Sequence, residues 1–291
     1  MQIIKANGNI EEFDESKLIK AITRTGAKID LAHEICNYVK DKCYQNYKDG
    51  KPIKTEYIYN LAFKHLKNIS KPSALKYSLK RSLLEIGPSG FPFEKFIAEI
   101  WKHEGYEAIT GQMVMGRCVS HEVDVVAWKE DSLIMIEAKY HSDAGSRTDL
   151  KNALYVKARY DDIKVNTFNI NSFDVSNINN KNDKMPEKLS EGWLITNTYF
   201  SDTAITYAKC NDLKLMSFDY PEDGSLQDKI IEYSLYPITV LTTLNKEEKK
   251  QLIDQNIILC QQLYNRNDLL EDMGFDKEKI FIILEEIGSV L

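Results

Sequence analysis

The chain lacks the features that mark several classes of protein. Its cysteines are widely spaced and form no CxxC pair (Cys36, Cys43, Cys118, Cys210 and Cys260), which argues against a disulfide framework or a zinc knuckle. No apolar run approaches the roughly 20 residues that span a bilayer. The first residues contain neither a basic leader nor an apolar signal core. These absences favour a protein that does not enter membranes, with a cytoplasmic location as the default expectation.

The chain also lacks a net positive charge, since the net charge is −6. Its distribution is uneven, however. Residues 1–90 hold 16 Lys and Arg against 10 Asp and Glu, residues 91–221 hold 15 against 20, and residues 222–291 hold 7 against 14. The basic first third suits a polyanionic ligand, whereas the acidic last third makes phosphate binding there doubtful.

A chain of 291 residues with 43% hydrophobic content is long enough for more than one domain. The segment IGPSGFP at 86–92 concentrates two glycines and two prolines and indicates a boundary. Before it, alternation around Asn7-Gly8 predicts a β-hairpin, and helical patterns follow at 15–26, 31–48, 55–68 and 72–85. Residues 245–291 show a helical pattern throughout. We therefore divide the chain into residues 1–87, 88–236 and 237–291.

The middle part alternates between helical and strand patterns. A helix is predicted near 93–105, strands near 106–118, 121–128 and 132–140, and a helix at about 147–164. A long Asn-rich loop at 165–190 precedes a strand, a helix, another strand and a further helix. This alternation predicts an α/β fold with a mixed central sheet between helices.

The predicted hairpin at 121–141 carries charges among its apolar residues. Glu137 and Lys139 alternate onto one face of their strand, and a turn at 129–131 brings Asp124 alongside. Converging carboxylates repel each other unless a cation lies between them, and hard oxygen ligands suit Mg²⁺ or Mn²⁺. Together with a lysine, such a site can hydrolyse phosphodiesters. The alternative is that these are solvated charges of an edge strand.

At this point the sequence resembles a known family. The order Asp124, then IEAKYH with Glu137 and Lys139, is similar to the Asp…Glu-x-Lys core of the PD-(D/E)xK nucleases, in particular the Mrr-like restriction endonuclease domain. The helix FPFEKFIAEIWKHEGYEA and the later WLITNTYFSDTAITYAKC follow in the family's order, over roughly residues 91–235. The resemblance implies that Asp124 and Glu137 are metal ligands, that Ala138 lends a backbone carbonyl, and that Lys139 is the catalytic lysine.

The sequence allows more than one role for several further residues near this core. The resemblance makes Glu94 a helix carboxylate near the metal, although a solvated helix flank explains it equally well. His121 and Glu122 stand where the family usually has a glycine-rich turn, so His121 either contacts a phosphate, acts as a second base or is structural. Arg147 and Lys151, four residues apart on the next predicted helix, would share a face and hold a phosphate backbone, unless they are ordinary solvated charges.

The N-terminal part resembles the ATP-cone, a small regulatory nucleotide-binding module. Ile3, Lys5, Gly8, Phe13, Asp14, Lys17 and Leu18 fit its first motif, and ALKYSLKR at 74–81 fits its later helix. The resemblance implies ATP or dATP as ligand, with Ile3, Lys5 and Lys17 at the binding site. Ala6 and Asn7 depart from the usual Arg and Asp, which puts the affinity or the identity of the nucleotide in question. The alternative is a helical domain whose lysines are solvated or face DNA.

These observations predict a metal-dependent DNA endonuclease regulated by a nucleotide. Because one site cuts one strand, double-strand cleavage would require a homodimer. An RNA or single-strand nuclease stays open. An alternative from a different functional class is a nucleotide-sensing, DNA-binding regulator whose nuclease fold is catalytically silent. The C-terminal helices are expected to serve packing or dimerisation.

Overall fold

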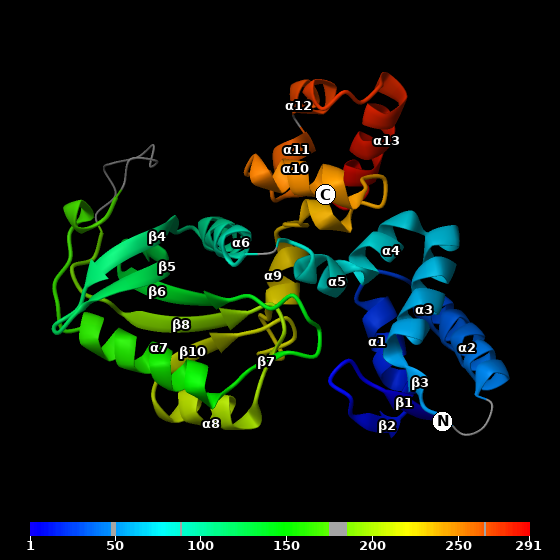
Figure 1. The fold of residues 1–291 in the computed structure, drawn as a ribbon, viewed down its shortest axis with the longest axis horizontal. Helices are drawn as coiled ribbons and strands as arrows, with labels where there is room; N and C mark the ends of the chain where they lie inside the picture. The colour runs from blue at the N-terminus through cyan, green and yellow to red at the C-terminus, as the bar shows by residue number, and fades with distance from the viewer. Residues whose placement is uncertain (48–50, 88, 175–184, 265) are drawn as a thin grey trace.

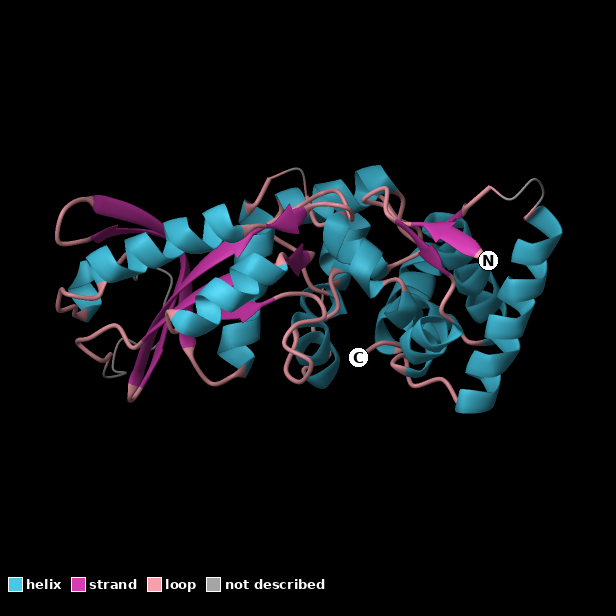
Figure 2. Cartoon of the chain, turned by 90° about the horizontal axis from the view of Figure 1, so that it is seen from below, coloured by secondary structure: helices cyan, strands magenta, loops and turns pink. Residues whose placement is uncertain are grey.

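The computed structural model describes residues 1–47, 51–87, 89–174, 185–264 and 266–291. The N-terminal part lies at one end, a five-stranded sheet with its helices lies at the other, and the C-terminal helices pack beside the junction (Figure 1). Viewed from below, strands occur in the small N-terminal sheet and in the large sheet at the opposite end (Figure 2). The predicted α/β class is confirmed.

The N-terminal part is a small sheet covered by helices. The Asn7-Gly8 turn joins two antiparallel strands as predicted, with Gly8 at the positive φ of +84° that such a turn requires. Asp14 caps the first helix by accepting a hydrogen bond from the backbone N–H of Ser16. The sequence did not reveal the third strand, which pairs parallel with the first. The elements are β1 (Gln2–Ile4), β2 (Ile10–Glu12), α1 (Glu15–Thr23), α2 (Ile29–Asn46), β3 (Ile53–Lys54), α3 (Thr55–Ile69), α4 (Lys71–Tyr77) and α5 (Leu79–Leu84).

The large sheet has the order β10-β8-β6-β5-β4 and is mixed, as expected. Strands β4, β5 and β6 form an antiparallel meander, whereas β6, β8 and β10 run parallel. The elements of this part are α6 (Phe91–His103), β4 (Glu107–Met115), β5 (Ser120–Lys129), β6 (Ser132–Lys139), β7 (Arg147–Thr148), α7 (Leu150–Ile163), η1 (Ile170–Ser172), β8 (Glu191–Thr196), β9 (Tyr199–Phe200), α8 (Asp202–Cys210), β10 (Leu213–Met216) and α9 (Leu226–Glu232).

Two details of the middle part differ from expectation. Helix α7 begins at Leu150, and Arg147 lies instead in the short strand β7, paired with β9. The prediction that Arg147 and Lys151 share a helix face is therefore wrong. In the Asn-rich segment, Phe168, Phe173 and Leu189 are buried against the sheet, so its ends are anchored. Residues 175–184 lie outside the described residues.

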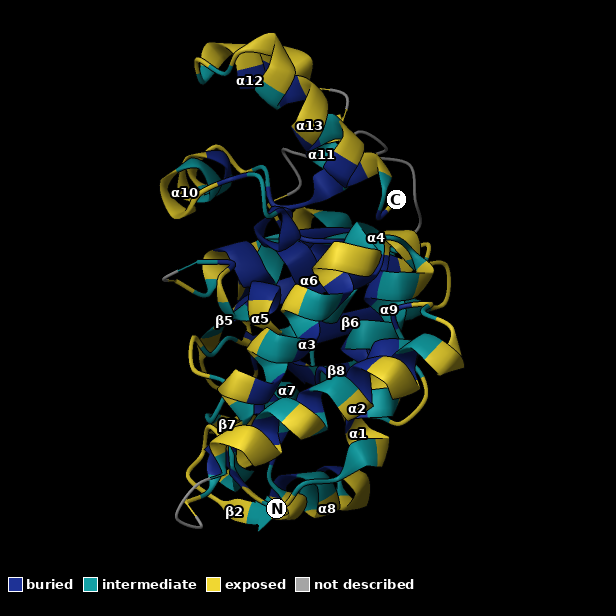
Figure 3. Cartoon of the chain, turned by 90° about the vertical axis from the view of Figure 1, so that its right-hand side faces the viewer, coloured by how far each residue is buried: buried dark blue, intermediate teal, exposed yellow. Residues whose placement is uncertain are grey.

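Alternation along the strands divides the core between the two faces of the large sheet. Val125, Ala127 and Ile136 pack on the α6 side, while Val126, Trp128 and Met135 face the side of α7. The apolar cluster on the α6 side continues without a break into the C-terminal helices, whose outer surfaces are exposed (Figure 3). These elements are η2 (Ile238–Val240), α10 (Lys246–Asp254), α11 (Cys260–Tyr264), α12 (Asn267–Asp272) and α13 (Lys277–Gly288). A packing role for this segment agrees with that continuity.

A buried carboxylate ties the C-terminal helices together. Glu286 of α13 is 1% exposed, and it accepts hydrogen bonds from the backbone N–H and hydroxyl groups of both Thr242 and Thr243. Lys71 of α4 approaches the same carboxylate at 3.9 Å. Burial raises the pKa of Glu286, but these hydrogen bonds outweigh that effect, so its pKa lies below the usual range.

Glu286→Ala is expected to lower the free energy of unfolding by about 3 kcal/mol, because four donors at Thr242 and Thr243 lose their acceptor in a buried place. Thermal or urea unfolding measures the change. The exposed neighbour Glu285 supplies the control, and Glu285→Ala should change stability by no more than about 0.5 kcal/mol. Equal effects of the two substitutions would contradict this account of Glu286.

Candidate active site

The candidate site lies where two strands of the large sheet separate. Strands β5 and β6 pair from Lys129 and Ser132 up to Val125 and Ile136. Beyond that point, the start of β5 pairs with β4 and the end of β6 pairs with β8. Asp124 and Glu137 are the first residues past the last pair. Both predicted metal ligands therefore stand at one fork in the sheet.

Asp124 partly fills the gap at this fork. Its Oδ2 accepts a hydrogen bond of 2.7 Å from the backbone N–H of Ala138. Burial and then the negative charge of Glu137 raise the pKa of Asp124 to about 6, although the Ala138 N–H and the cation of Arg159 oppose that rise. Ala138 is thus at the site, with its N–H committed to Asp124, and the predicted role of its carbonyl stays a prediction.

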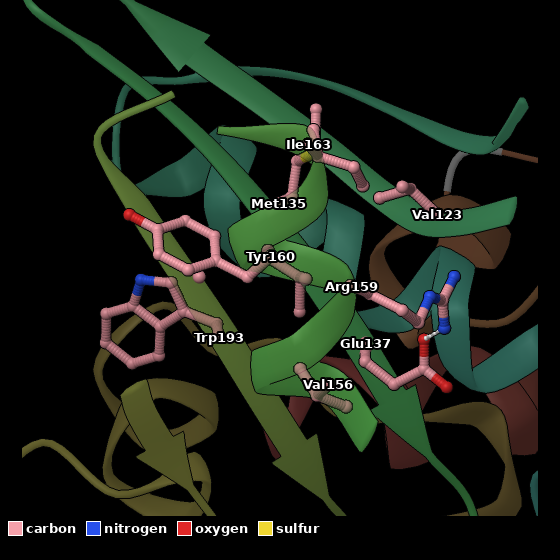
Figure 4. Close-up of a pocket in the computed structure, with 10 residues that line it drawn as sticks. Val123, Met135, Glu137, Val156, Arg159, Tyr160, Ile163 and Trp193 are labelled. Atoms are coloured by element: carbon pink, nitrogen blue, oxygen red, sulfur yellow. Dashed lines mark hydrogen bonds and ion pairs between the residues drawn. The ribbon is translucent and has the colours of Figure 1, made fainter. Parts of the chain in front are cut away.

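Glu137 is held by a cation that the sequence did not identify. Its Oε2 lies 2.5 Å from Nη1 of Arg159, which belongs to α7, and both side chains are largely covered. Figure 4 shows this ion pair at the edge of a small, mainly apolar pocket between α7 and the sheet, lined among others by Met135, Tyr160 and Trp193. The guanidinium of Arg159 therefore supplies the positive charge that Glu137 requires.

Glu94 reaches the same region from the first turn of α6. Burial is the largest influence that raises its pKa to about 7, and the charges of Asp124, Glu122 and Glu137 add to it. Such coupling requires these carboxyl groups to lie near each other. Glu94 is half-buried and interacts electrostatically with the carboxylates at the fork, so it is not a fully solvated flank of its helix.

Lys139 ends β6 and alternates with Glu137 on the same strand. Its side chain is exposed, and in the described part of the chain it forms no ion pair or hydrogen bond. The ammonium group is thus free to turn toward an anion at the edge of the sheet.

A pocket of about 310 Å³ opens at the fork. It is lined by Ser120, His121, Glu122, Asp124, Glu137, Tyr155 and Arg159. It combines three carboxylates with an arginine and a histidine, whereas Glu94 and Lys139 lie outside its lining. Among the described residues, no three His, Cys, Asp or Glu side chains are already arranged to hold a metal ion.

The predicted nucleotide site lies on the N-terminal hairpin. Nζ of Lys5 is 2.7 Å from Oε2 of Glu11, and Nζ of Lys17 is 3.5 Å from Oε1 of the same carboxylate. The hydrogen bond from Lys5 is the main cause that lowers the pKa of Glu11. The two lysines therefore converge on the carboxylate of Glu11, and their binding of a triphosphate stays a prediction. The side chain of Ile3, by contrast, is buried in the core.

The hairpin also touches the part of the chain that carries the pocket. Its turn packs against Gly145, where a Cβ would lie 2.9 Å from the carbonyl oxygen of Ala6. Gly145 belongs to the loop between β6 and β7, which follows Lys139 directly. Tyr199 fixes this loop by donating a hydrogen bond of 2.8 Å to the carbonyl of Gly145. The hairpin that carries the predicted nucleotide site is thus in direct contact with the loop that follows β6.

The sequence alone did not reveal the roles of two residues on α7. Arg159 binds Glu137, and Asp162 binds His121. The two residues are three positions apart, so they lie on one face of the helix. That spacing is the sequence signal that could have indicated a shared role for them. The sequence does not say which strand residues that face meets.

Two segments of the chain match known families. Residues 1–83 match the ATP cone domain. The N-terminal part is an ATP-cone domain. Residues 236–291 match the AF1548-like, C-terminal family. Neither match covers residues 84–235, so the nuclease interpretation of that segment stays a prediction.

The similar whole proteins carry no assigned activity. An uncharacterized protein of Archaeoglobus fulgidus is 29% identical over 196 residues, which covers 67% of this chain and 99% of that protein. The crystal structure of AF1548, a protein of unknown function, is similar with 28% identity and a TM-score of 0.53, covering 69% of this chain and 98% of that one. Within the described residues, no helix is both long and apolar enough to span a bilayer.

Glu94→Gln is expected to change how stability depends on pH. Between the usual pKa of 4.5 and about 7, the folded protein keeps a proton on Glu94 that the unfolded chain has released, so stability falls as pH rises through this window. Glutamine removes that loss. The variant should therefore melt at a higher temperature than the wild type at pH 8 and at nearly the same temperature at pH 5. Glu130→Gln, in an exposed turn, should show no such divergence.

Proposed function

We propose that the central segment is a metal-dependent endonuclease that hydrolyses phosphodiester bonds in DNA and that the ATP-cone domain regulates it. The observation that carries this proposal is the fork, where Asp124 and Glu137 line one pocket and the pKa of Glu94 responds to both. A protein that gathers carboxylates in a partly buried place stabilises them best with a cation.

The donor set suits Mg²⁺ or Mn²⁺, because carboxylate oxygens are the ligands that these hard cations prefer. Asp124, Glu137 and the Ala138 carbonyl are the proposed ligands. A divalent ion there would polarise a phosphoryl oxygen and lower the pKa of a bound water. To bind such an ion, Glu137 must exchange its contact with Arg159, which leaves the guanidinium free to meet a phosphate.

The remaining side chains have roles that follow from their positions. Lys139, exposed and unpaired at the end of β6, offsets the negative charge that develops on the attacked phosphate and orients the water. Glu94 is an auxiliary carboxylate that supports the two carboxylate ligands of the metal. Because each chain has one such site, cutting both strands of a duplex requires two chains, and a homodimer is part of the proposal.

The ATP-cone domain supplies the regulation in this proposal. ATP or dATP would displace Glu11 from Lys5 and Lys17, since a triphosphate carries more negative charge than one carboxylate. The turn beside these lysines rests on Gly145, in the loop that begins after Lys139. A shift of the hairpin on nucleotide binding therefore reaches the end of β6.

A second function is favoured by the ion pair at the pocket. Arg159 already neutralises Glu137, and the described residues contain no ready group of three metal-binding side chains. A nuclease fold kept for DNA binding alone, under nucleotide control, would have these properties. This regulator would bind DNA and cut nothing.

Incubation of plasmid DNA with Mg²⁺ or Mn²⁺, with and without ATP and dATP, is the decisive assay. Wild-type protein is expected to nick or linearise the plasmid. Lys139→Ala should reduce the rate by at least about 100-fold while DNA binding persists, because it removes charge stabilisation of the transition state. Lys129→Ala, at the exposed end of β5, is the control and should cut normally.

The regulator interpretation predicts no metal-dependent cleavage by the wild type. Melting curves with Mn²⁺ supply a readout without turnover, since a bound ion stabilises the folded state. Mn²⁺ should raise the melting temperature of the wild type and not that of Asp124→Asn. An unchanged wild-type melting temperature together with an uncut plasmid would leave the regulator as the better assignment.

Two substitutions on the hairpin should change nucleotide affinity in opposite directions. Lys5→Ala removes one ammonium group and should weaken ATP binding about tenfold, as expected for a charge-assisted contact. Glu11→Gln removes the carboxylate that competes for Lys5 and Lys17 and should strengthen it. Lys64→Ala, exposed on α3, should leave the affinity unchanged. Calorimetric titration measures the ATP affinity of all three variants. Weaker ATP binding by Glu11→Gln would refute the proposal that the triphosphate displaces Glu11 from the two lysines.

A further inference from the structure

Asp162, near the end of α7, is built into the turn between β4 and β5. Its carboxylate accepts backbone hydrogen bonds from Cys118 at 3.0 Å and Val119 at 3.3 Å, and Nε2 of His121 lies 2.9 Å from Oδ2. A Cβ on Gly116 would collide with this carboxylate. The position of Asp162 is therefore fixed by three donors and a required glycine.

This arrangement fixes the chemistry of the His121 ring. The hydrogen bond from His121 is the largest influence that lowers the pKa of Asp162 to about 2, so Asp162 is an anionic acceptor at neutral pH. An anionic acceptor keeps the proton of the neutral imidazole on Nε2. Nδ1 is then the basic nitrogen, and in the described part of the chain it has no hydrogen-bond partner.

Two other bases around the pocket are already engaged, and a third, Glu122, is exposed to solvent. Asp124 accepts the Ala138 N–H, and Glu137 pairs with Arg159. His121 lines the same pocket and its side chain is only 14% exposed. It combines a free basic nitrogen with an orientation that a second residue holds, which is the arrangement a general base requires.

We propose that His121 is the general base of the pocket and that Asp162 is its positioning residue. The assignment rests on the proposed phosphodiester hydrolysis. As the water oxygen forms its bond to phosphorus, one water proton passes to Nδ1. The bond from phosphorus to the leaving oxygen breaks, and that oxygen takes a proton from solvent. The cycle closes when the imidazolium releases its proton to solvent, and nothing is oxidised or reduced.

Charged and titratable groups surround the ring on several elements. They are Glu122 and Asp124 on β5, Glu137 on β6, Arg159 and Asp162 on α7, and Arg117 and Cys118 in the β4–β5 turn. Asp162 stabilises the imidazolium that forms when Nδ1 takes the proton.

The test uses the full chain with Mg²⁺ and plasmid DNA. His121→Gln keeps a side chain that can bind Asp162 but has no basic nitrogen. It should lower kcat by about 100-fold, the usual contribution of a general base, with little change in KM. In His121→Gly, added imidazole should restore part of kcat. Asp124→Asn should not respond to imidazole, and His103→Gln, on the exposed end of α6, should cut like the wild type.

Each outcome decides one of the two assignments. If the wild type cuts DNA and His121→Gln keeps its kcat, the base is another group and only this inference is overturned. The same holds if His121→Gly melts like the wild type, has lost activity and gains nothing from imidazole. A wild type that cuts no DNA overturns the proposed function and, with it, the role of His121.

Discussion

The organisation of the central segment depends on the loss of pairing between β5 and β6. Strand pairing satisfies backbone groups, so a place where two strands part must satisfy them in another way. Here the carboxylate of Asp124 accepts the N–H of Ala138. The fork thus draws an acidic side chain into the sheet, and the next residue of the facing strand, Glu137, stands close enough to raise its pKa. The pocket is a consequence of that separation.

Helix α7 determines how this excess of negative charge is balanced. Arg159 pairs with Glu137 and Asp162 holds His121, so one face of the helix contacts both sides of the pocket. Arg159 also lies over the ring of Tyr155, with its guanidinium carbon 5.2 Å from the ring centre. An arginine in this position satisfies Glu137 without a metal. Under the proposed function it would become a phosphate-binding group once a metal took Glu137. Whether Glu137 stays paired with Arg159 therefore distinguishes the proposed enzyme from the silent regulator.

The three parts of the chain are joined by specific contacts. Tyr140, just after Lys139, donates a hydrogen bond of 2.5 Å to the carbonyl of Leu84 in α5. Thr239 in turn donates to the carbonyl of Ser82 at 2.8 Å. Helix α5 is thus bonded to both the end of β6 and the C-terminal segment. Together with the hairpin contact at Gly145, it gives the ATP-cone domain two points of contact near the proposed site.

Local patterns in the sequence were enough to determine most elements and the residues at the fork. Asp14 and Ser201 cap helices because their side chains accept backbone N–H groups nearby in the chain, and alternation along β6 is a property of any strand. The motif at 124–139 and the hairpin lysines could be recognised from the sequence because the residues of each pattern lie close together in the chain.

Only the tertiary structure decided which distant groups meet. The pairing of Arg159 with Glu137 and of Asp162 with His121 spans 22 and 41 residues, and it depends on how α7 lies across the sheet. Strand β7 replaced the expected start of α7 because Arg147 and Thr148 found a partner in β9, about 50 residues away along the chain. The sequence by itself determined which side chains had the chemistry for a site. Packing between elements decided which of them share a pocket, because that depends on contacts that no local pattern encodes.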